Sequence, residues 1–238
     1  MRVKASQILE IMRSWVGMDR ACGTHKPIID LYNSHKPLAR GYCVTMRDAY
    51  CATTVSAAFI KADAVDMIGG TECGADEFIK LFKKAGIWCE DGNVVPTPGA
   101  IIEYNWDIKA QPNDGPADHI GIVEKVSEGL LTVLEGNIGG KVGRRTLPVG
   151  WGQIRGYAFP DYLAEEETVY NVGWNLSFRE SSKKMEWWYA YGSKRGDYYK
   201  NCVAQINGKI YAFDDEGWMK EGVFSAKTSP DGDIIAIL

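Results

Sequence analysis

The sequence predicts an α+β fold in which helices come first, short strands follow, and a small aromatic-rich module ends the chain. Apolar residues recur at helical spacing up to Gly86, and the period changes to that of strands from about residue 100. After residue 168, aromatic side chains become frequent and long aliphatic side chains become scarce. These shifts divide the chain into a first domain over 1–162, an acidic linker over 163–168, and a β-hairpin module over 169–238.

Amphipathic helices are expected in the first part of the chain. Apolar residues at helical spacing predict helices over about 8–16 and 28–32. A third helix should begin at or just before Cys51 and extend to about residue 62. A fourth covers about 78–85 and should stop at Gly86, because glycine readily adopts the conformation that ends a helix.

Short strands are expected next, because each following apolar segment is bounded by a glycine-bearing turn. These strands cover residues 100–104, 119–126, 130–134, 142–146 and 154–159. Helices followed by a meander of strands favour helices packed on an antiparallel sheet over a doubly wound fold. In the final module, Asn207-Gly208 occupies the two turn positions of a predicted hairpin over 205–211.

Composition excludes several classes of function. The chain has 27 basic and 31 acidic residues without a basic stripe, which argues against binding to nucleic acid. No apolar run is long enough to insert into a membrane, and Gln7 and Glu10 interrupt the only candidate signal peptide. We therefore expect a protein made in the cytoplasm of its host without a signal peptide.

The six cysteines are too sparse for a disulfide framework, so unpaired thiols are expected. Cys22, His25, His35 and Cys43 were weighed as zinc ligands. Their spacing differs from that of common zinc sites, so structural or solvent-facing roles are preferred and no metal or cofactor is predicted.

Cys51 and His119 form the strongest candidate catalytic pair. Cys51 lies at the start of a predicted helix, where unsatisfied N–H groups favour a thiolate, and His119 opens a strand. With only three histidines in the chain, few other bases are available. The plain alternative is that Cys51 is a small packing residue, and Cys73, which also precedes a helix, is a competing nucleophile.

Glu135 and Asn137 are candidates to orient the imidazole. In an extended strand both would share the buried face of Leu131 and Val133, where a polar side chain needs a partner. The residues alone do not decide between the two.

Four ordered segments resemble the CHAP family of cysteine, histidine-dependent amidohydrolases and peptidases. They are Tyr-Cys-Ala-Thr-Thr-Val-Ser at 50–56, Pro-Gly-Ala-Ile-Ile-Glu-Tyr at 98–104, Asp-His-Ile-Gly-Ile-Val-Glu at 118–124 and Glu-Gly-Asn at 135–137. The resemblance implies a papain-like fold that hydrolyses amide bonds in peptidoglycan. It also implies that Cys51 is the nucleophile, His119 the base and then the acid, and Glu135 with Asn137 the groups that orient it.

The sequence departs from the family in one respect, and it also offers candidate substrate contacts. Some members of the family bind calcium before the cysteine, but residues 46–50 offer a single carboxylate here, so calcium is not predicted. Tyr50, Trp106 and Trp151 are the candidate substrate contacts, with ordinary anchoring of loops as the alternative for the two tryptophans.

The final module is similar to the aromatic repeats of choline-binding and related cell-wall-binding modules, most clearly over 206–222. Stacked rings can bind a quaternary ammonium group or the face of a sugar, or can simply build the hairpin core. The candidate wall contacts are Trp187, Trp188, Tyr211 and Trp218.

The resemblances together predict an endolysin-type peptidoglycan hydrolase that acts on Gram-positive walls after release from the cytoplasm. The bond cut is that of an N-acetylmuramoyl-L-alanine amidase or of an endopeptidase. Two rivals are a non-catalytic wall-binding protein on a papain-like scaffold and a zinc-dependent wall hydrolase.

Overall fold

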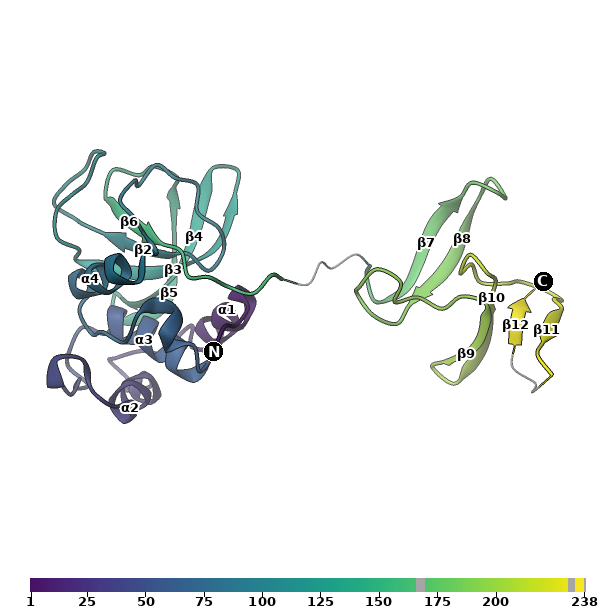
Figure 1. The fold of residues 1–238 in the computed structure, drawn as a ribbon, viewed down its shortest axis with the longest axis horizontal. Helices are drawn as coiled ribbons and strands as arrows, with labels where there is room; N and C mark the ends of the chain where they lie inside the picture. Colours follow the sequence, from purple (N-terminus) through teal and green to yellow (C-terminus); the bar gives the residue numbers. More distant parts are fainter. Residues whose placement is uncertain (166–169, 231–233, 238) are drawn as a thin grey trace. The chain divides into compact units, whose positions relative to one another are not determined.

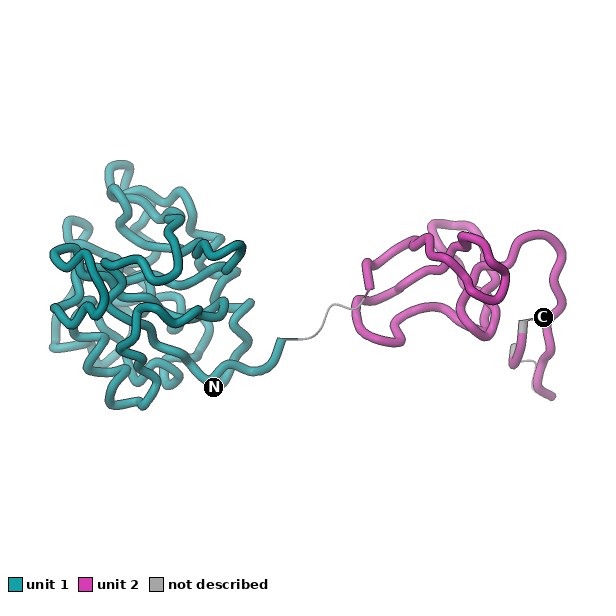
Figure 2. The backbone as a smooth tube through the Cα atoms, turned by 90° about the horizontal axis from the view of Figure 1, so that it is seen from above, with its two compact units in different colours: residues 1–165 teal, residues 166–238 magenta. Residues whose placement is uncertain are grey.

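The computed structural model describes residues 1–165, 170–230 and 234–237, and the chain forms two compact units, 1–165 and 166–238 (Figure 2). The first unit extends past the predicted domain end. The N–H of Leu163 donates to the carbonyl of Val3, and Glu165 accepts hydrogen bonds from Ser6. The start of the predicted acidic linker is therefore held by the first unit, and residues 166–168 of that linker lie outside the described residues.

The helices of the first unit precede its main strands, as expected (Figure 1). They are α1 (Ala5–Ser14), α2 (Lys26–Ser34), α3 (Cys51–Lys61) and α4 (Ala75–Ala85), with short 3-10 helices η1 (Ala39–Gly41) and η2 (Val65–Ile68). The predicted start of α3 at Cys51 is confirmed, and so is the stop of α4 at Gly86, which has a φ of +72°. Within the described residues, no helix combines the length and apolar character needed to span a bilayer.

The strands of the first unit form a six-stranded antiparallel sheet with the order β1-β6-β2-β3-β4-β5. Their bounds are β1 (Trp88–Cys89), β2 (Ile101–Tyr104), β3 (His119–Ser127), β4 (Leu130–Ile138), β5 (Lys141–Pro148) and β6 (Ile154–Ala158). The α+β class is thereby confirmed. The two-residue strand β1 was not predicted, and β4 is longer than the expected 130–134.

Helix α3 is the central helix of this unit. Residues 51–59 of the helix are all buried, and it packs on α2 and on strands β3 and β4. The sheet face that meets the helices carries Ile101, Ile120 and Leu134, whereas the opposite face carries Ile102, Tyr104 and Val133 in a second core. Because both faces are buried, the ends of the strands near α3 are held rigidly.

The second unit consists of three two-stranded sheets within the residues that the structure describes. The strands are β7 (Gly173–Arg179), β8 (Lys184–Ala190), β9 (Cys202–Ile206), β10 (Lys209–Phe213), β11 (Ala226–Thr228) and β12 (Ile234–Ile237). The predicted hairpin is β9–β10, and Asn207 and Gly208 have φ values of +49° and +78°, as a tight turn of this type requires. Trp174, Tyr199 and Tyr211 pack on Phe213, so aromatic rings supply most of the small core.

Candidate active site

Cys51 is the first residue of α3 and is 7% exposed. The backbone carbonyl of Tyr50 accepts hydrogen bonds from the N–H and the hydroxyl of Thr54, which fixes the first turn. The N–H groups at the start of a helix have no partner within it and point outward beside the sulfur. The local structure therefore presents a thiol together with hydrogen-bond donors that suit a developing oxyanion.

His119 opens β3 and lies between Cys51 and Glu135. Its Nε2 atom is 2.9 Å from Glu135 Oε2, and the Cys51 side chain is near enough to raise the pKa of the ring through hydrogen bonding and charge. Burial lowers the pKa of His119, but the bonds to Cys51 and Glu135 outweigh this effect and raise the pKa to about 9. With Nε2 occupied by Glu135, we assign Nδ1 to the sulfur.

Glu135 is fully buried and is held by three groups. Besides His119, the Tyr104 hydroxyl donates to Oε1 at 2.8 Å, and Arg145 Nε lies 2.9 Å from Oε1 and 3.1 Å from Oε2. Burial raises the pKa of Glu135, but hydrogen bonds from His119 and Arg145 more than offset this, so the pKa lies below its usual value. Glu135 is therefore placed to hold the His119 ring through its bond to Nε2.

Two glycines make this arrangement possible. A Cβ atom on Gly121 would lie 2.8 Å from Glu135 Cγ and 2.6 Å from Val133 Cγ1, so a side chain there would displace the carboxylate. A Cβ atom on Gly136 would lie 2.1 Å from Thr54 Oγ1 and 3.0 Å from the Tyr50 carbonyl oxygen. The start of α3 thus packs directly against the backbone of β4.

Asn137 does not share the position of Glu135, contrary to the strand alternation used above. The pairing of β4 with β5 is irregular between Glu135 and Ile138, and Asn137 has a φ of +59°. Its side-chain oxygen is buried and has no hydrogen-bond partner among the described residues. Of the two candidates, the structure brings only Glu135 within hydrogen-bonding distance of His119.

Trp106 and Trp151 border the site. The Trp106 ring stacks on Tyr104 with a centroid distance of 5.0 Å and lies 5.7 Å from the ring of His119. Trp151 lies 6.1 Å from Trp106. Asp118, the residue before His119, accepts a hydrogen bond from the backbone N–H of Trp106, which ties the tryptophan loop to the start of β3.

Tyr50 requires a correction. Its side chain is fully buried, its hydroxyl donates to the carbonyl of Gly140, and its ring lies 4.7 Å from that of His25. A substrate cannot reach this ring. Tyr50 instead supports the start of α3 from within the core.

Glu103 on β2 is an unexpected buried carboxyl near the site. Both of its oxygens are buried without a hydrogen-bond partner among the described residues. Burial raises the pKa of Glu103 well above its usual value, and the neighbouring Cys51 and Asp76 add to this. Burial of this carboxyl therefore favours its neutral form.

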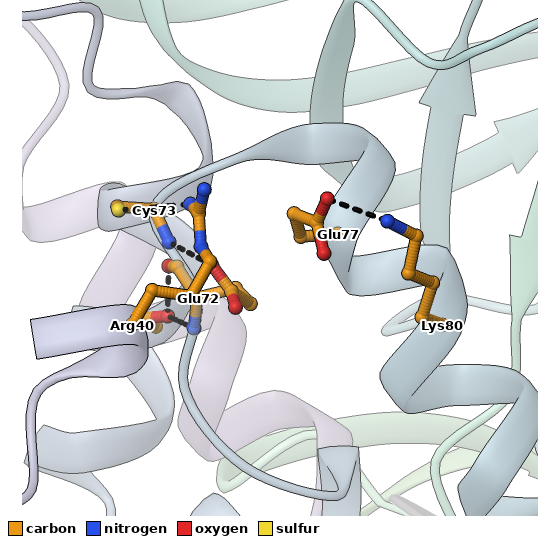
Figure 3. A network of polar contacts seen from close by, with 6 residues as sticks. Arg40, Glu72, Cys73, Glu77 and Lys80 are labelled. Carbon is orange, nitrogen blue, oxygen red and sulfur yellow. Dashed lines mark hydrogen bonds and ion pairs between the residues drawn. The ribbon is translucent and has the colours of Figure 1, made fainter.

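Cys73, the competing nucleophile, lies in a different polar network (Figure 3). Its sulfur is 3.4 Å from Arg40 Nη2, and its N–H donates to Glu72, which also accepts from Arg40. These partners include no imidazole. The geometry favours Cys51, whose neighbour is a histidine.

The candidate zinc ligands are not assembled into a site. Across residues 1–165, 170–230 and 234–237, no three His, Cys, Asp or Glu side chains lie close enough together to hold a metal ion. His25 is buried against Tyr50, whereas Cys22 and Cys43 are exposed. All six cysteines lie in the described part of the chain, and none forms a disulfide there.

The candidate catalytic groups fall inside a segment that matches a known family. The CHAP domain model matches residues 39–137. The match contains Cys51, His119, Glu135 and Asn137, and it ends before Arg145. The fit of the CHAP domain supports a hydrolase of this family.

Solved structures similar to this chain include "The crystal structure of Ly7917", with 16% identity, a TM-score of 0.40, and coverage of 98% of this chain and 91% of that chain. Another is "The crystal structure of Ly7917 with the hydrolyzing product of MDP", with 16% identity, a TM-score of 0.34, and coverage of 97% and 90%. A search of curated proteins gave no match.

Sequence reasoning missed Tyr104 and Arg145, the two other partners of Glu135. Tyr104 pairs with His119 across β2 and β3, and Arg145 pairs with Val133 across β4 and β5. Directly paired residues lie on the same face of a sheet, so the predicted 130–146 hairpin held a signal for Arg145. Tyr104 required the order of the strands, which periodicity does not give.

Proposed function

We propose that this protein is a cysteine-dependent peptidoglycan hydrolase of the endolysin type, which cuts an amide bond of the bacterial wall peptide. The observation that carries the proposal is the row of Cys51, His119 and Glu135, in which one imidazole bonds both the thiol and a buried carboxylate. The match to the CHAP domain supports the same reaction class. The bond cut is that of an amidase or an endopeptidase.

The proposed reaction has two steps. The proton of the Cys51–His119 pair lies on the imidazole when the sulfur attacks the carbonyl carbon, and the N–H groups at the start of α3 stabilise the oxyanion. The C–N bond then breaks, and His119 protonates the leaving amine. In the second step His119 takes a proton from water, the hydroxide attacks the thioester, and the carboxylic acid and the Cys51 thiol are released.

Each remaining group has a role that follows from its contacts. Glu135 holds the His119 ring and stabilises its charged form, and Tyr104 with Arg145 fixes Glu135. Trp106 and Trp151 provide apolar surfaces beside His119 on which a sugar or peptide chain can lie.

Product analysis tests this function. Full-length protein is incubated with purified Gram-positive peptidoglycan of defined composition, and mass spectrometry identifies the new termini. We expect one new amine and one new carboxylate per cut, unchanged by a chelator, together with loss of activity on alkylation of Cys51. A protein that binds walls without releasing new termini would be the scaffold of the rival hypothesis, and loss of activity with a chelator would favour the zinc-dependent rival.

The aromatic residues of the second unit support a wall-binding role. Trp187 and Trp188 are neighbours on β8, so their side chains lie on opposite faces of the β7–β8 hairpin. One pocket, of about 330 Å³, is lined by Trp174, Trp187, Tyr211 and Met219. The other, of about 270 Å³, is lined by Tyr170, Ser177, Trp188, Tyr198, Glu216 and Trp218. The four candidate wall contacts are thus shared between two pockets.

We propose that the pocket of Trp188 binds a quaternary ammonium group of the wall. The rings of Tyr170, Trp188 and Tyr198 are nearly perpendicular to one another, with interplanar angles of 78°, 83° and 88°. Three such walls suit a compact cation. Glu216 also lines the pocket, and its carboxylate pairs with Arg179 at 3.1 Å. Trp218 completes the lining of the pocket. The guanidinium carbon of Arg179 lies 5.8 Å from the centroid of the Trp218 ring.

Titration of the full chain with choline tests this pocket through tryptophan fluorescence. A Trp188→Ala variant should bind choline about tenfold more weakly than wild type, because it loses a ring contact of about 1–2 kcal/mol. Trp187→Ala, on the other face of the hairpin, serves as the matched control. A wild-type signal that does not saturate, or equal weakening in both variants, would mean that the rings only build the hairpin core.

A further inference from the structure

Arg145 has N–H donors that its contact with Glu135 does not use. Its Nε atom bonds Glu135, but its two terminal nitrogens have no hydrogen-bond partner among the described residues. The side chain is 29% exposed, whereas that of Glu135 is fully buried. A guanidinium group carries five N–H donors in one plane, so the outer edge of Arg145 remains available to a ligand.

The position of this outer edge is fixed beside the reacting groups. The guanidinium carbon of Arg145 lies 5.2 Å from the ring centroid of Trp106 and 5.7 Å from that of Tyr104. Trp106 in turn lies 5.7 Å from the ring of His119. The cation is therefore held by an aromatic surface, a short distance from the base that serves the scissile amide.

The charge at this place also favours an anion. The single carboxylate of Glu135 is shared between Arg145 and His119, so Arg145 has no carboxylate partner to itself. An arginine in such a position suits planar, bidentate binding of a carboxylate.

We propose that Arg145 binds a carboxylate of the substrate peptide, namely the α-carboxylate of the D-glutamyl residue of the wall stem. The inference rests on the proposed function and names the substrate that the site prefers. Arg145 then has two roles, because Nε positions Glu135 and the terminal nitrogens bind the substrate. Peptides in which this carboxylate is a carboxamide should be poorer substrates.

The test combines enzyme variants with a pair of substrates. Two synthetic muropeptides differ only in whether the D-glutamyl α-carboxyl is free or amidated, and kcat and KM are measured for each. For the wild type we expect kcat/KM to favour the free acid by about 10- to 100-fold, the range of a hydrogen bond between charged groups, chiefly through KM. In Arg145→Met this ratio should fall to about 1.

The acid-to-amide ratio of kcat/KM distinguishes direct binding of the substrate by Arg145 from an effect that Arg145 exerts through Glu135. If Arg145 acted only through Glu135, Arg145→Met would slow both substrates equally, and the acid-to-amide ratio would keep its wild-type value. Arg144→Gln is the matched control, because Arg144 is the neighbour on β5 and pairs instead with Glu124 at 2.6 Å. This control should retain the wild-type ratio.

The remaining outcomes are also decisive. A wild-type ratio near 1, or the same ratio in wild type and Arg145→Met, overturns the inference while leaving the hydrolase function intact. If Arg145→Met does not fold, Arg145→Gln, which is uncharged, replaces it, and a ratio unchanged from wild type again overturns the inference. If wild-type protein cleaves neither muropeptide nor whole peptidoglycan, the proposed function itself is wrong.

Discussion

A Cys51→Ala variant should lose hydrolysis of peptidoglycan by about 10,000-fold or more, while its folding stays close to that of the wild type. The loss is large because nucleophile and base act as a unit, so removing one abolishes the covalent route. Cys51 is buried, but the substitution removes only one sulfur atom, so the free energy of unfolding should fall by about 1 kcal/mol. Release of soluble wall fragments and thermal unfolding measure the two effects.

Cys73→Ala is the matched control for this substitution. Cys73 also lies just before a helix, but its sulfur contacts Arg40 and not a histidine. This variant should keep activity within a few-fold of the wild type. Hydrolysis that persists in a folded Cys51→Ala protein, or that disappears in Cys73→Ala, would assign the nucleophile to the wrong cysteine.

A Glu135→Gln variant should lower kcat by about 100- to 10,000-fold and change the pH dependence of the reaction. Glu135 holds the His119 ring and favours its protonated form, and removal of the equivalent carboxylate in other triads has effects of this size. Without the carboxylate, the pKa of His119 should fall below its present value of about 9. The alkaline limb of the activity profile should therefore move to lower pH.

The same substitution has a pH-dependent effect on stability. Since the pKa of His119 is raised from 6.5 to about 9 on folding, its stabilising contribution is complete below pH 6.5 and is lost as the pH rises to about 9. The stability advantage of the wild type over Glu135→Gln should shrink across this window, by about 3 kcal/mol at most. Urea unfolding at several pH values measures it.

Glu124→Gln controls for the loss of a paired carboxylate. Hydrogen bonds from Arg144, and also from Arg13, lower the pKa of Glu124 to about 2, yet it does not touch the catalytic row. This variant should leave the alkaline limb in place. If Glu135→Gln and Glu124→Gln have the same pH profile, Glu135 does not act on His119.

Local signals in the sequence predicted the elements that carry the candidate nucleophile and the candidate base, because α3 begins at Cys51 and β3 begins at His119. The small residues after Cys51 and the glycine at Gly86 set helix bounds that the structure confirms. Asn207-Gly208 likewise predicted its hairpin, because both residues tolerate the positive φ that the turn requires. These features depend on a few adjacent residues, and no long-range contact was needed to identify them.

The rest of the site depends on long-range geometry. Strand alternation could not choose between Glu135 and Asn137, because the irregular pairing after Glu135 breaks the alternation. Tyr50 was expected to contact the substrate, yet its side chain is fully buried, because neighbours in sequence can face opposite directions at the start of a helix. Arg145 lies beyond the segment that matches the CHAP domain, and only the β4–β5 pairing brings it to Glu135.

The close approach at Gly136 bears on how such a protein can change its substrate over time. Helix α3, which carries Cys51, and strand β4, which carries Glu135, touch through main-chain atoms and Thr54. Their separation therefore does not depend on bulky side chains whose size changes with substitution. The loops of Trp106 and Trp151 contribute no atoms to that contact. Selection or directed evolution can therefore remodel these loops for a new wall chemistry while the reacting groups keep their spacing.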